Sequence, residues 1–400
     1  MSIIRALKVS VLAGTLFAAG AFAPGSGSTA VAAQDVSVCL WGTITGPDAI
    51  LNGMSYGARD YFEYLNQFKG GIAGQKVRTL LLDGRYKLDE ELKIYRRCVD
   101  QEQAVFVSGW STGAVKALRD QIAQDQIPFM AQSHSSEVLD PVKLPYIFIP
   151  GPTYEQQMVI ALRALKQQGG KTVAVMHPDN EYGRGPVNVV RQSGLIEKTG
   201  LKLADTIEFP FDTQDLTAQM LRLKSRNPDM VYVQASTPQL LVILRDAAKV
   251  GLPAKLFVGN MYNISAAIPE QLGKGAEGFR TIQIYADFGA DIPAMKEIDA
   301  FRTKNEIAKQ DVYYMKGWFQ GIVMAKAIEN AIAKNGGKIP DDIRSFRKAV
   351  RTEMTSLRSL DVGGIVPEAN YDTHQGTTLA RIAEIRDGRY VPVSDWIDAR

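Results

Sequence analysis

Apolar and polar positions follow one another in the pattern of an α/β protein. Short apolar runs are each followed by a longer segment with apolar residues every three or four positions, which is typical of a strand and then an amphipathic helix. Strands are expected at 36–41, 76–82, 104–107, 127–131, 172–176, 203–209, 230–234 and 256–258. Helices are expected at 53–68, 88–103, 115–123, 154–168, 186–199, 216–225, 239–250, 292–309, 313–333 and 343–354. The alternation predicts parallel sheets covered by helices.

The strand–helix–strand unit at 104–131 carries a polar loop at the end of each of its strands. These loops are Ser108–Gly113 and Gln132–Ser136. The carboxyl ends of parallel strands lie at one edge of a sheet, so both loops should line one crevice, where such folds bind ligands. Ser and Thr hydroxyls and the free amides of a helix N-terminus suit a carboxylate or another acceptor group. The unit therefore predicts half of a small-molecule site.

Two breaks in the alternation indicate two domains. A proline-rich stretch at 141–152 is typical of an extended crossover, and a second crossover is expected near 280–287. The last part of the chain, 363–400, has the pattern of short strands and turns. The fold class predicted is α/β, with two doubly wound domains.

The N-terminal segment 1–33 has the pattern of a cleavable signal peptide. Arg5 and Lys8 precede the apolar run Val9–Ala23, and Ala30–Ala33 supplies small residues for cleavage before Ala33 or Gln34. The apolar run is shorter than the roughly 20 residues that a membrane span needs. We therefore expect an exported, soluble, periplasmic protein with no membrane insertion after cleavage.

The charge and the cysteine content indicate which partners and which compartment the protein is suited to. Without residues 1–33 the chain has 44 basic and 43 acidic residues, so nothing in its charge favours nucleic acid or an anionic membrane. Cys39 lies in a strand pattern and Cys98 in a helical one. A disulfide between them and two separate buried thiols are both compatible with an oxidising compartment.

One motif suggests an enzyme. Gly109–Gly113 matches the G-x-S-x-G nucleophile elbow between a strand and a helix. A secreted serine hydrolase would use Ser111, with His374 and Asp361 or Asp372 completing a triad. No oxyanion-loop motif precedes the elbow, and the histidines lack metal-binding spacing. Binding without catalysis, cofactor or metal is therefore the preferred interpretation.

Four stretches resemble the periplasmic ligand-binding proteins of the leucine/isoleucine/valine type, the receptors of branched-chain amino acid ABC importers. Thr45–Pro47 looks like that family's S-G-P loop, and Leu65–Val77 looks like its I-N-x-x-G-G-I-x-G-x-x-V run. Asp179–Gly185 looks like its D-x-x-Y-G-x-G loop, and Asp212–Asp229 looks like its D-F-S…L-K…P-D stretch. The resemblance covers nearly all of the mature chain, and the order and spacing of these stretches make it specific.

The resemblance implies the type I periplasmic binding protein fold, in which three hinge crossovers join two lobes that close on a ligand. The lobes would comprise residues 34–150 plus 285–375 and residues 151–284 plus 376–400. The partner implied is an inner-membrane ABC permease; a ligand-sensing module of a regulatory system is the alternative role. The ligand-binding residues expected are Trp110, Ser111, Thr112, Ser133, His134, Ser135, Tyr182, Ser236, Asn260 and Met261.

The sequence alone does not identify the ligand. Amino-acid receptors of this type place an acid near the position of Asn260 and Met261 to hold the ammonium group, and this chain has none there. A buried ammonium without an anionic partner costs several kcal/mol. An aromatic or other small carboxylate, or a small amide, is therefore expected, while Asp287 or Glu181 would restore the charge for an amino acid.

Overall fold

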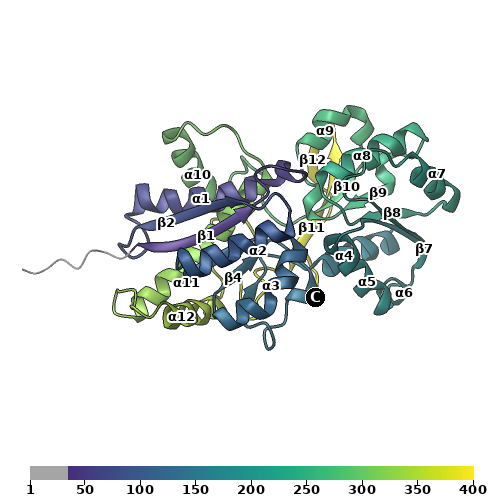
Figure 1. The fold of residues 1–400 in the computed structure, drawn as a ribbon. Helices are drawn as coiled ribbons and strands as arrows, with labels where there is room; N and C mark the ends of the chain where they lie inside the picture. Colours follow the sequence, from purple (N-terminus) through teal and green to yellow (C-terminus); the bar gives the residue numbers. More distant parts are fainter. Residues whose placement is uncertain (1–34) are drawn as a thin grey trace, which may run out of the picture. The chain divides into compact units, whose positions relative to one another are not determined.

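The computed structural model describes residues 35–400 and contains two β-sheets (Figure 1). The predicted signal peptide lies outside the described residues. Five parallel strands form the first sheet in the order β2-β1-β3-β4-β5. Its strands are β1 Val36–Gly42, β2 Val77–Asp83, β3 Phe106–Gly109, β4 Phe129–Ala131 and β5 Ile147–Phe148.

The second sheet has eight strands in the order β12-β11-β10-β9-β8-β6-β7, with β13 paired to β11. Strands β6 to β10 run parallel, and β11 joins β10, β12 and β13 antiparallel. The strands are β6 Thr172–Pro178, β7 Lys202–Phe209, β8 Met230–Val233, β9 Phe257–Gly259, β10 Arg280–Gln283, β11 Leu379–Arg386, β12 Arg389–Pro392 and β13 Ile397–Asp398.

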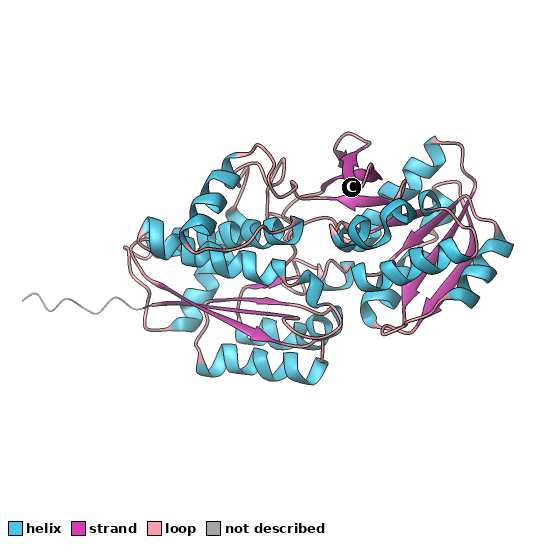
Figure 2. Cartoon of the chain, turned by 90° about the horizontal axis from the view of Figure 1, so that it is seen from above, coloured by secondary structure: helices cyan, strands magenta, loops and turns pink. Residues whose placement is uncertain are grey.

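Helices flank the strands of each sheet (Figure 2). They are α1 Gly53–Tyr64, α2 Leu88–Arg96, α3 Thr112–Asp125, α4 Tyr154–Gln167, α5 Glu181–Gln192, α6 Leu195–Lys198, α7 Thr217–Arg226, α8 Thr237–Lys249, α9 Ala267–Leu272, α10 Pro293–Lys304, α11 Val312–Lys334 and α12 Ile343–Ser356. None of the helices within 35–400 is long and apolar enough to cross a bilayer. The predicted α/β class with doubly wound parallel sheets is confirmed, whereas the lobe boundaries stay a prediction.

Both sheets reverse their strand order at one point. In the first sheet the chain passes from β1 to β2 on one side and then to β3 on the other, and in the second sheet β6 is flanked by β7 and β8. The loops that leave the strands at such a point diverge, which opens a crevice at the carboxyl ends of the strands. The topology therefore specifies where a ligand site can form.

Helix α5 begins earlier than the sequence pattern predicts. The prediction started this helix at Pro186, but the helix begins at Glu181, because the Asn180 side chain accepts a hydrogen bond from the Gly183 amide at 3.1 Å. Pro186 lacks an N–H, which leaves the Tyr182 carbonyl without its helical donor. The Gln234 side chain donates to that carbonyl instead, at 3.2 Å. Tyr182 therefore lies in the first turn of a helix and not in a loop.

The stretch near which the second crossover was predicted begins with a strand. Residues Arg280–Gln283 form β10, which pairs with β9 on one side and with β11 on the other. The crossover was predicted near 280–287, and the strand within that stretch was missed because its partner β11 follows almost 100 residues later and leaves no local signal. Similarly, the first predicted crossover contains the short strand β5.

A disulfide joins Cys39 in β1 to Cys98 in the turn that follows α2, and their Cα atoms are 5.8 Å apart. Both residues are fully buried. The same turn is held by Arg347 of α12, which donates to the carbonyls of Ala104 at 2.8 Å and Val99 at 3.2 Å. Of the two alternatives that the sequence left open, the structure shows the bonded one.

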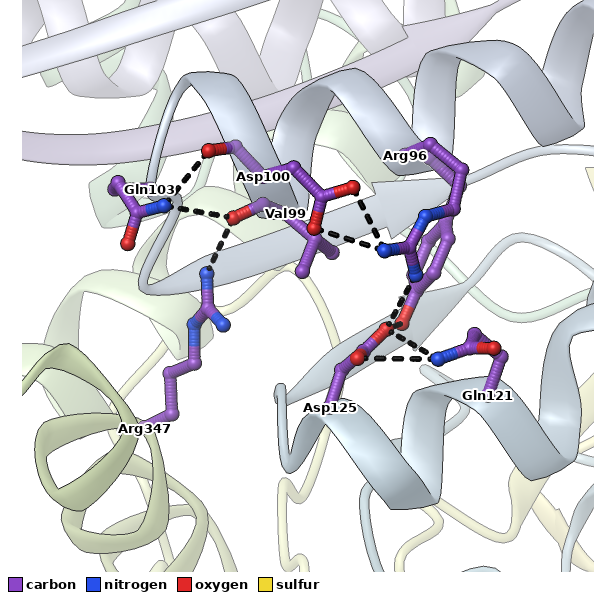
Figure 3. Close-up of polar contacts among 8 residues, drawn as sticks. Arg96, Val99, Asp100, Gln103, Gln121, Asp125 and Arg347 are labelled. Carbon is purple, nitrogen blue, oxygen red and sulfur yellow. Dashed lines mark hydrogen bonds and ion pairs between the residues drawn. The ribbon is translucent and has the colours of Figure 1, made fainter.

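A polar cluster next to this turn ties α2 to α3 (Figure 3). Asp125, at the end of α3, accepts hydrogen bonds from the Tyr95 hydroxyl at 2.8 Å and from Arg96 at 3.1 Å. Gln121 donates to the same carboxylate, and Arg96 also pairs with Asp100. The cluster fixes the two helices that precede and follow β3, whose carboxyl end carries the Gly109–Gly113 loop.

Helices α1 and α11 approach each other closely through glycines. A Cβ atom on Gly57 would lie 2.2 Å from the Tyr314 carbonyl oxygen, and one on Gly317 would lie 2.1 Å from the Met54 carbonyl oxygen. The Tyr314 hydroxyl bridges the same pair of helices by donating to Asp60 at 3.0 Å. Because the backbones touch, the position of α1 is set by α11.

Candidate functional site

A small cavity, most of whose lining residues are buried, lies at the carboxyl ends of the strands of both sheets. Its volume of about 20 Å³ accommodates about one water molecule. From the first sheet, its lining comes from loops and helix starts that follow β1, β2, β3, β4 and β5. From the second sheet, it comes from segments that follow β6, β8 and β9. The lining residues are Asp48, Leu51, Met54, Tyr86, Trp110, Ser111, Thr112, Gln132, Tyr154, Tyr182, Ser236 and Tyr262.

A larger surface groove of about 820 Å³ lies elsewhere, along Tyr61, Lys69, Lys326 and Arg358. It is not at the strand ends. We take the small cavity as the functional site because its polar groups converge from both sheets, at the position where α/β sheets bind ligands.

The N-terminus of α3 forms the polar end of the cavity. The Ser111 hydroxyl caps the helix by accepting from the Ala114 amide at 3.2 Å, and the Ser111 amide donates to Glu91 Oε2 at 3.0 Å. Thr112 Oγ1 and Ser133 Oγ share a hydrogen bond at 2.8 Å. The amides of Thr112 and Gly113 have no backbone acceptor within 35–400, so this end can receive an anionic or acceptor group.

Of the ten residues predicted to bind a ligand, five line the cavity: Trp110, Ser111, Thr112, Tyr182 and Ser236. Two more lie directly behind lining residues. Ser133 contacts the Thr112 hydroxyl, and the Asn260 side chain donates to the Tyr182 hydroxyl at 2.6 Å.

The other three predicted residues bond within the protein. His134 Nδ1 lies 2.9 Å from the Pro152 carbonyl oxygen, and burial holds the pKa of this histidine well below its usual value. The Ser135 hydroxyl accepts from the Glu137 amide at 3.3 Å, and the Met261 amide donates to Gln157 at 3.1 Å. None of the three lines the cavity.

Seven lining residues were not among the predicted site residues, although Gln132 belongs to a loop that was expected to line the crevice. The seven are Asp48, Leu51, Met54, Tyr86, Gln132, Tyr154 and Tyr262. Most of them stand singly, outside any motif. Their common signal is position, because Asp48, Tyr86 and Gln132 each follow the end of a predicted strand in the parallel sheet.

Three tyrosines form one wall of the cavity. The ring centroids of Tyr154 and Tyr182 are 5.2 Å apart, and those of Tyr182 and Tyr262 are 6.0 Å apart. Burial raises the pKa of Tyr154 to about 12, and it raises the pKa values of the other two well above normal. All three hydroxyl groups are therefore neutral at physiological pH. Each tyrosine offers the cavity an apolar ring with a polar hydroxyl at its edge.

Tyr262 also links the second sheet to the first. Its hydroxyl donates to the Gln132 carbonyl oxygen at 2.5 Å, and it accepts from Nζ of Lys316 on α11 at 2.8 Å. Lys316 is fully buried, and burial holds its pKa well below the usual value. Because Lys316 is absent from the cavity lining, its role here is to position the Tyr262 hydroxyl.

Asp48 is the acidic residue of the cavity wall. Only 3% of its surface is exposed, and it accepts a hydrogen bond from the Ser236 hydroxyl at 2.7 Å. Burial raises its pKa from 3.8 to about 6, against the opposing effect of that hydrogen bond. The two acids that the sequence suggested as charge partners lie elsewhere: Glu181 pairs with Lys116 at 2.7 Å, and Asp287 accepts from Gln283 at 3.0 Å.

The raised pKa of Asp48 predicts how its replacement changes stability with pH. In the ligand-free protein the folded state holds this proton more tightly than the unfolded chain, so the stabilisation is present below pH 4 and is lost as the pH rises through 6. We expect the stability of Asp48→Asn, relative to wild type, to increase by about 3 kcal/mol between pH 3.5 and 7. Urea unfolding at both pH values, after refolding to remove bound ligand, measures it. An unchanged difference would contradict the raised pKa.

The structure gives no support to the hydrolase hypothesis. The Ser111 hydroxyl caps α3. His374 Nδ1 lies 2.9 Å from the Ile147 carbonyl oxygen, and its ring stacks on Phe148. Within residues 35–400 no hydrogen bond joins Ser111 to a histidine, so the triad that the motif suggested is not assembled.

The sequence is similar to those of proteins named for amino acid binding. The "Leucine-, isoleucine-, valine-, threonine-, and alanine-binding protein" of Pseudomonas aeruginosa is 25% identical over 332 residues, which is 82% of this chain and 87% of that protein. The "Leu/Ile/Val-binding protein" of Escherichia coli K12 is 23% identical over 282 residues, which is 68% and 74% of the two chains.

Solved structures share the fold at lower identity. A branched-chain amino acid ABC transporter protein from Thermus thermophilus with bound valine has a TM-score of 0.81 and 22% identity, covering 91% of this chain and 96% of its own. A fatty acid ABC transporter substrate-binding protein from Thermomonospora curvata has a TM-score of 0.79 and 19% identity, covering 91% and 92%.

The predicted resemblance is therefore confirmed, and so is the type I periplasmic binding protein fold. Residues 35–389 match the family described as periplasmic binding protein. This match spans most of the chain, with the first sheet, strands β6 to β11 of the second and every residue of the cavity wall. The chain belongs to the periplasmic binding protein family.

Proposed function

We propose that the mature chain is a periplasmic receptor that captures a small ligand at the strand ends and presents it to an ABC permease of the inner membrane. One observation carries the proposal: polar and aromatic side chains from both sheets converge on a single buried cavity. The relatives named for amino acid binding and ABC transport support it. The proposal includes export by the segment 1–33 and the two predicted lobes.

The α3 N-terminus supports an orientation for the ligand. Its free amides and the hydroxyls of Ser111 and Thr112 face a position where an anionic or acceptor group would gain several hydrogen bonds at once. Tyr182 would cover the ligand from the other side. Ser133 and Asn260 would hold these two contacts from behind.

The contacts across the cavity support closure on a ligand. Asp48 and Ser236, Tyr262 and Gln132, and Lys116 and Glu181 each join a segment after a strand of one sheet to a segment after a strand of the other. The cavity holds about one water molecule, so a ligand enters only when these contacts open. Hinge opening and closing is the motion by which two-lobed binding proteins admit and bury ligands.

We propose binding alone, without chemistry on the ligand. The Ser111 hydroxyl is engaged as a helix cap, and the family is one of binding proteins. A generic ester should not be turned over by the purified protein. Turnover that is lost in Ser111→Ala would contradict this part of the proposal.

The predicted contact at Thr112 can be tested by substitution. Thr112→Val keeps the side-chain shape but removes the hydroxyl, so a ligand that accepts a hydrogen bond there should bind about ten- to a hundredfold more weakly. A thermal-shift screen of residues 34–400 with amino acids, aromatic carboxylates, dicarboxylates and short amides identifies the ligand, and calorimetry measures the loss.

The matched control is Thr352→Val, the same change at an exposed position of α12, which should leave the affinity unchanged. If no compound of the panel raises the melting temperature, the proposed function is contradicted. Equal affinity for Thr112→Val and the wild type would remove Thr112 from the site.

A further inference from the structure

The Asp48 carboxylate has no cationic partner in the part of the chain that the structure describes. It lies in the cavity wall and is almost fully buried. One oxygen, Oδ1, accepts from the Ser236 hydroxyl, whereas Oδ2 has no hydrogen-bond donor among residues 35–400. In that same range, no lysine, arginine or histidine nitrogen lies within 4.0 Å of either oxygen. Buried carboxylates are normally paired, so this one is an exception that calls for a partner.

The other titratable groups around Asp48 do not supply one. Tyr86, Tyr182 and Tyr313 interact electrostatically with it, and burial raises the pKa of each well above normal. They are therefore neutral. The buried amine of the region, Lys316, is directed to the Tyr262 hydroxyl and also lies over its ring, 4.7 Å from the centroid. Among residues 35–400, no group neutralises the Asp48 charge.

The surroundings of Asp48 are suited to a cation. Tyr86, Trp110 and Tyr182 line the same small cavity, and the faces of aromatic rings attract ammonium and guanidinium groups. Tyr86 is held in place by stacking on Phe211, with ring centroids 4.8 Å apart. A carboxylate next to several aromatic rings is an environment that a positively charged nitrogen stabilises from two sides.

We infer that Asp48 is the anionic anchor for a positively charged nitrogen on the ligand. The ligand class is then a small molecule with an ammonium, quaternary ammonium or amidinium group toward Asp48 and an acceptor group toward the α3 N-terminus. This inference rests on the proposed function. It places the anionic partner of the ligand nitrogen in the loop after β1. The family pattern instead places an acid near the position of Asn260.

Matched probe pairs test the inference directly. Each pair differs only in the cationic nitrogen: leucine with 4-methylpentanoate, phenylalanine with 3-phenylpropanoate, and 4-aminobutyrate with butyrate. Glycine betaine extends the series to a quaternary ammonium group. We expect at least one nitrogen-bearing probe to bind to residues 34–400 and its partner without the nitrogen to bind at least tenfold more weakly. Asp48→Asn should lose at least tenfold in affinity for the probe that binds, and Asp212→Asn, the same change at an exposed position, should lose none.

The outcomes separate the inference from the function on which it rests. If carboxylates without the nitrogen bind as tightly as their partners, or if Asp48→Asn binds the active probe like the wild type, the inference is overturned while the receptor function stands. If no probe binds at all, the proposed function fails and the inference fails with it. Thermal melting of ligand-free Asp48→Asn shows that the variant is folded, so that a loss of binding is not a loss of structure.

Discussion

Replacing Cys39 and Cys98 together by alanine should lower the free energy of unfolding by about 4 kcal/mol. The disulfide closes a loop of 59 residues in sequence separation, and a crosslink of that span removes many conformations from the unfolded chain. Both sulfurs are fully buried between β1 and the turn after α2, so the replacement also leaves a small void. Urea unfolding of the double variant and of the wild type gives the difference.

Reductant provides the control for the disulfide. Dithiothreitol should destabilise the wild type by a similar amount, and it should leave the double variant unchanged. If the wild type unfolds at the same urea concentration with and without reductant, the bond contributes nothing to stability, and the prediction is wrong.

Gly317→Ala should destabilise the protein by about 3 kcal/mol or more. The added Cβ would lie 2.1 Å from the Met54 carbonyl oxygen and 2.8 Å from the Ala58 amide nitrogen, so the backbones of α1 and α11 must separate. Overpacking of a well-filled interior costs about 1–3 kcal/mol when side chains can yield, and backbone atoms yield less. Thermal and urea unfolding measure the loss.

Gly275→Ala is the matched control. A Cβ there meets only Leu272 Cβ at 3.9 Å, so this variant should unfold like the wild type. Because Met54 also lines the cavity, a displaced α1 should weaken ligand binding in Gly317→Ala as well. Stability equal to that of the wild type would show that the two helices can separate without cost.

The order of strands and helices could be predicted because each element carries its own apolar period. What the sequence could not show was pairing between distant segments. Arg280–Gln283 is a strand because β9 and β11 lie beside it. The Cys39–Cys98 bond depends likewise on how β1 packs against the turn after α2. Neither contact leaves a trace in the local pattern.

The start of α5 shows how tertiary contacts change a local rule. The sequence pattern predicted a start at about Pro186, and proline normally occupies the first turn of a helix. The Gln234 side chain satisfies the carbonyl that the proline leaves free, so the helix extends back to Glu181. As a result Tyr182 is held on a helix, with its hydroxyl fixed by Asn260.

About half of the cavity could be found from sequence. Trp110, Ser111 and Thr112 stand in a polar loop at a strand end, which is a local signal. Asp48 and Tyr262 have no such signal, because an isolated acid or aromatic residue in a loop is common. Only the reversal of strand order in both sheets brings these two residues to the same cavity.

The fluorescence of Trp110 tests most directly whether the ligand binds in this cavity. Trp110 is a lining residue, so titration of the active ligand from the screen should change its emission in a saturable way, with the midpoint found by calorimetry. The change should be absent in Trp110→Phe, which retains the other three of the four tryptophans. Saturable binding that leaves the emission of the wild type unchanged, or that changes the emission of Trp110→Phe to the same extent, would place the ligand elsewhere and contradict a receptor site at the strand ends.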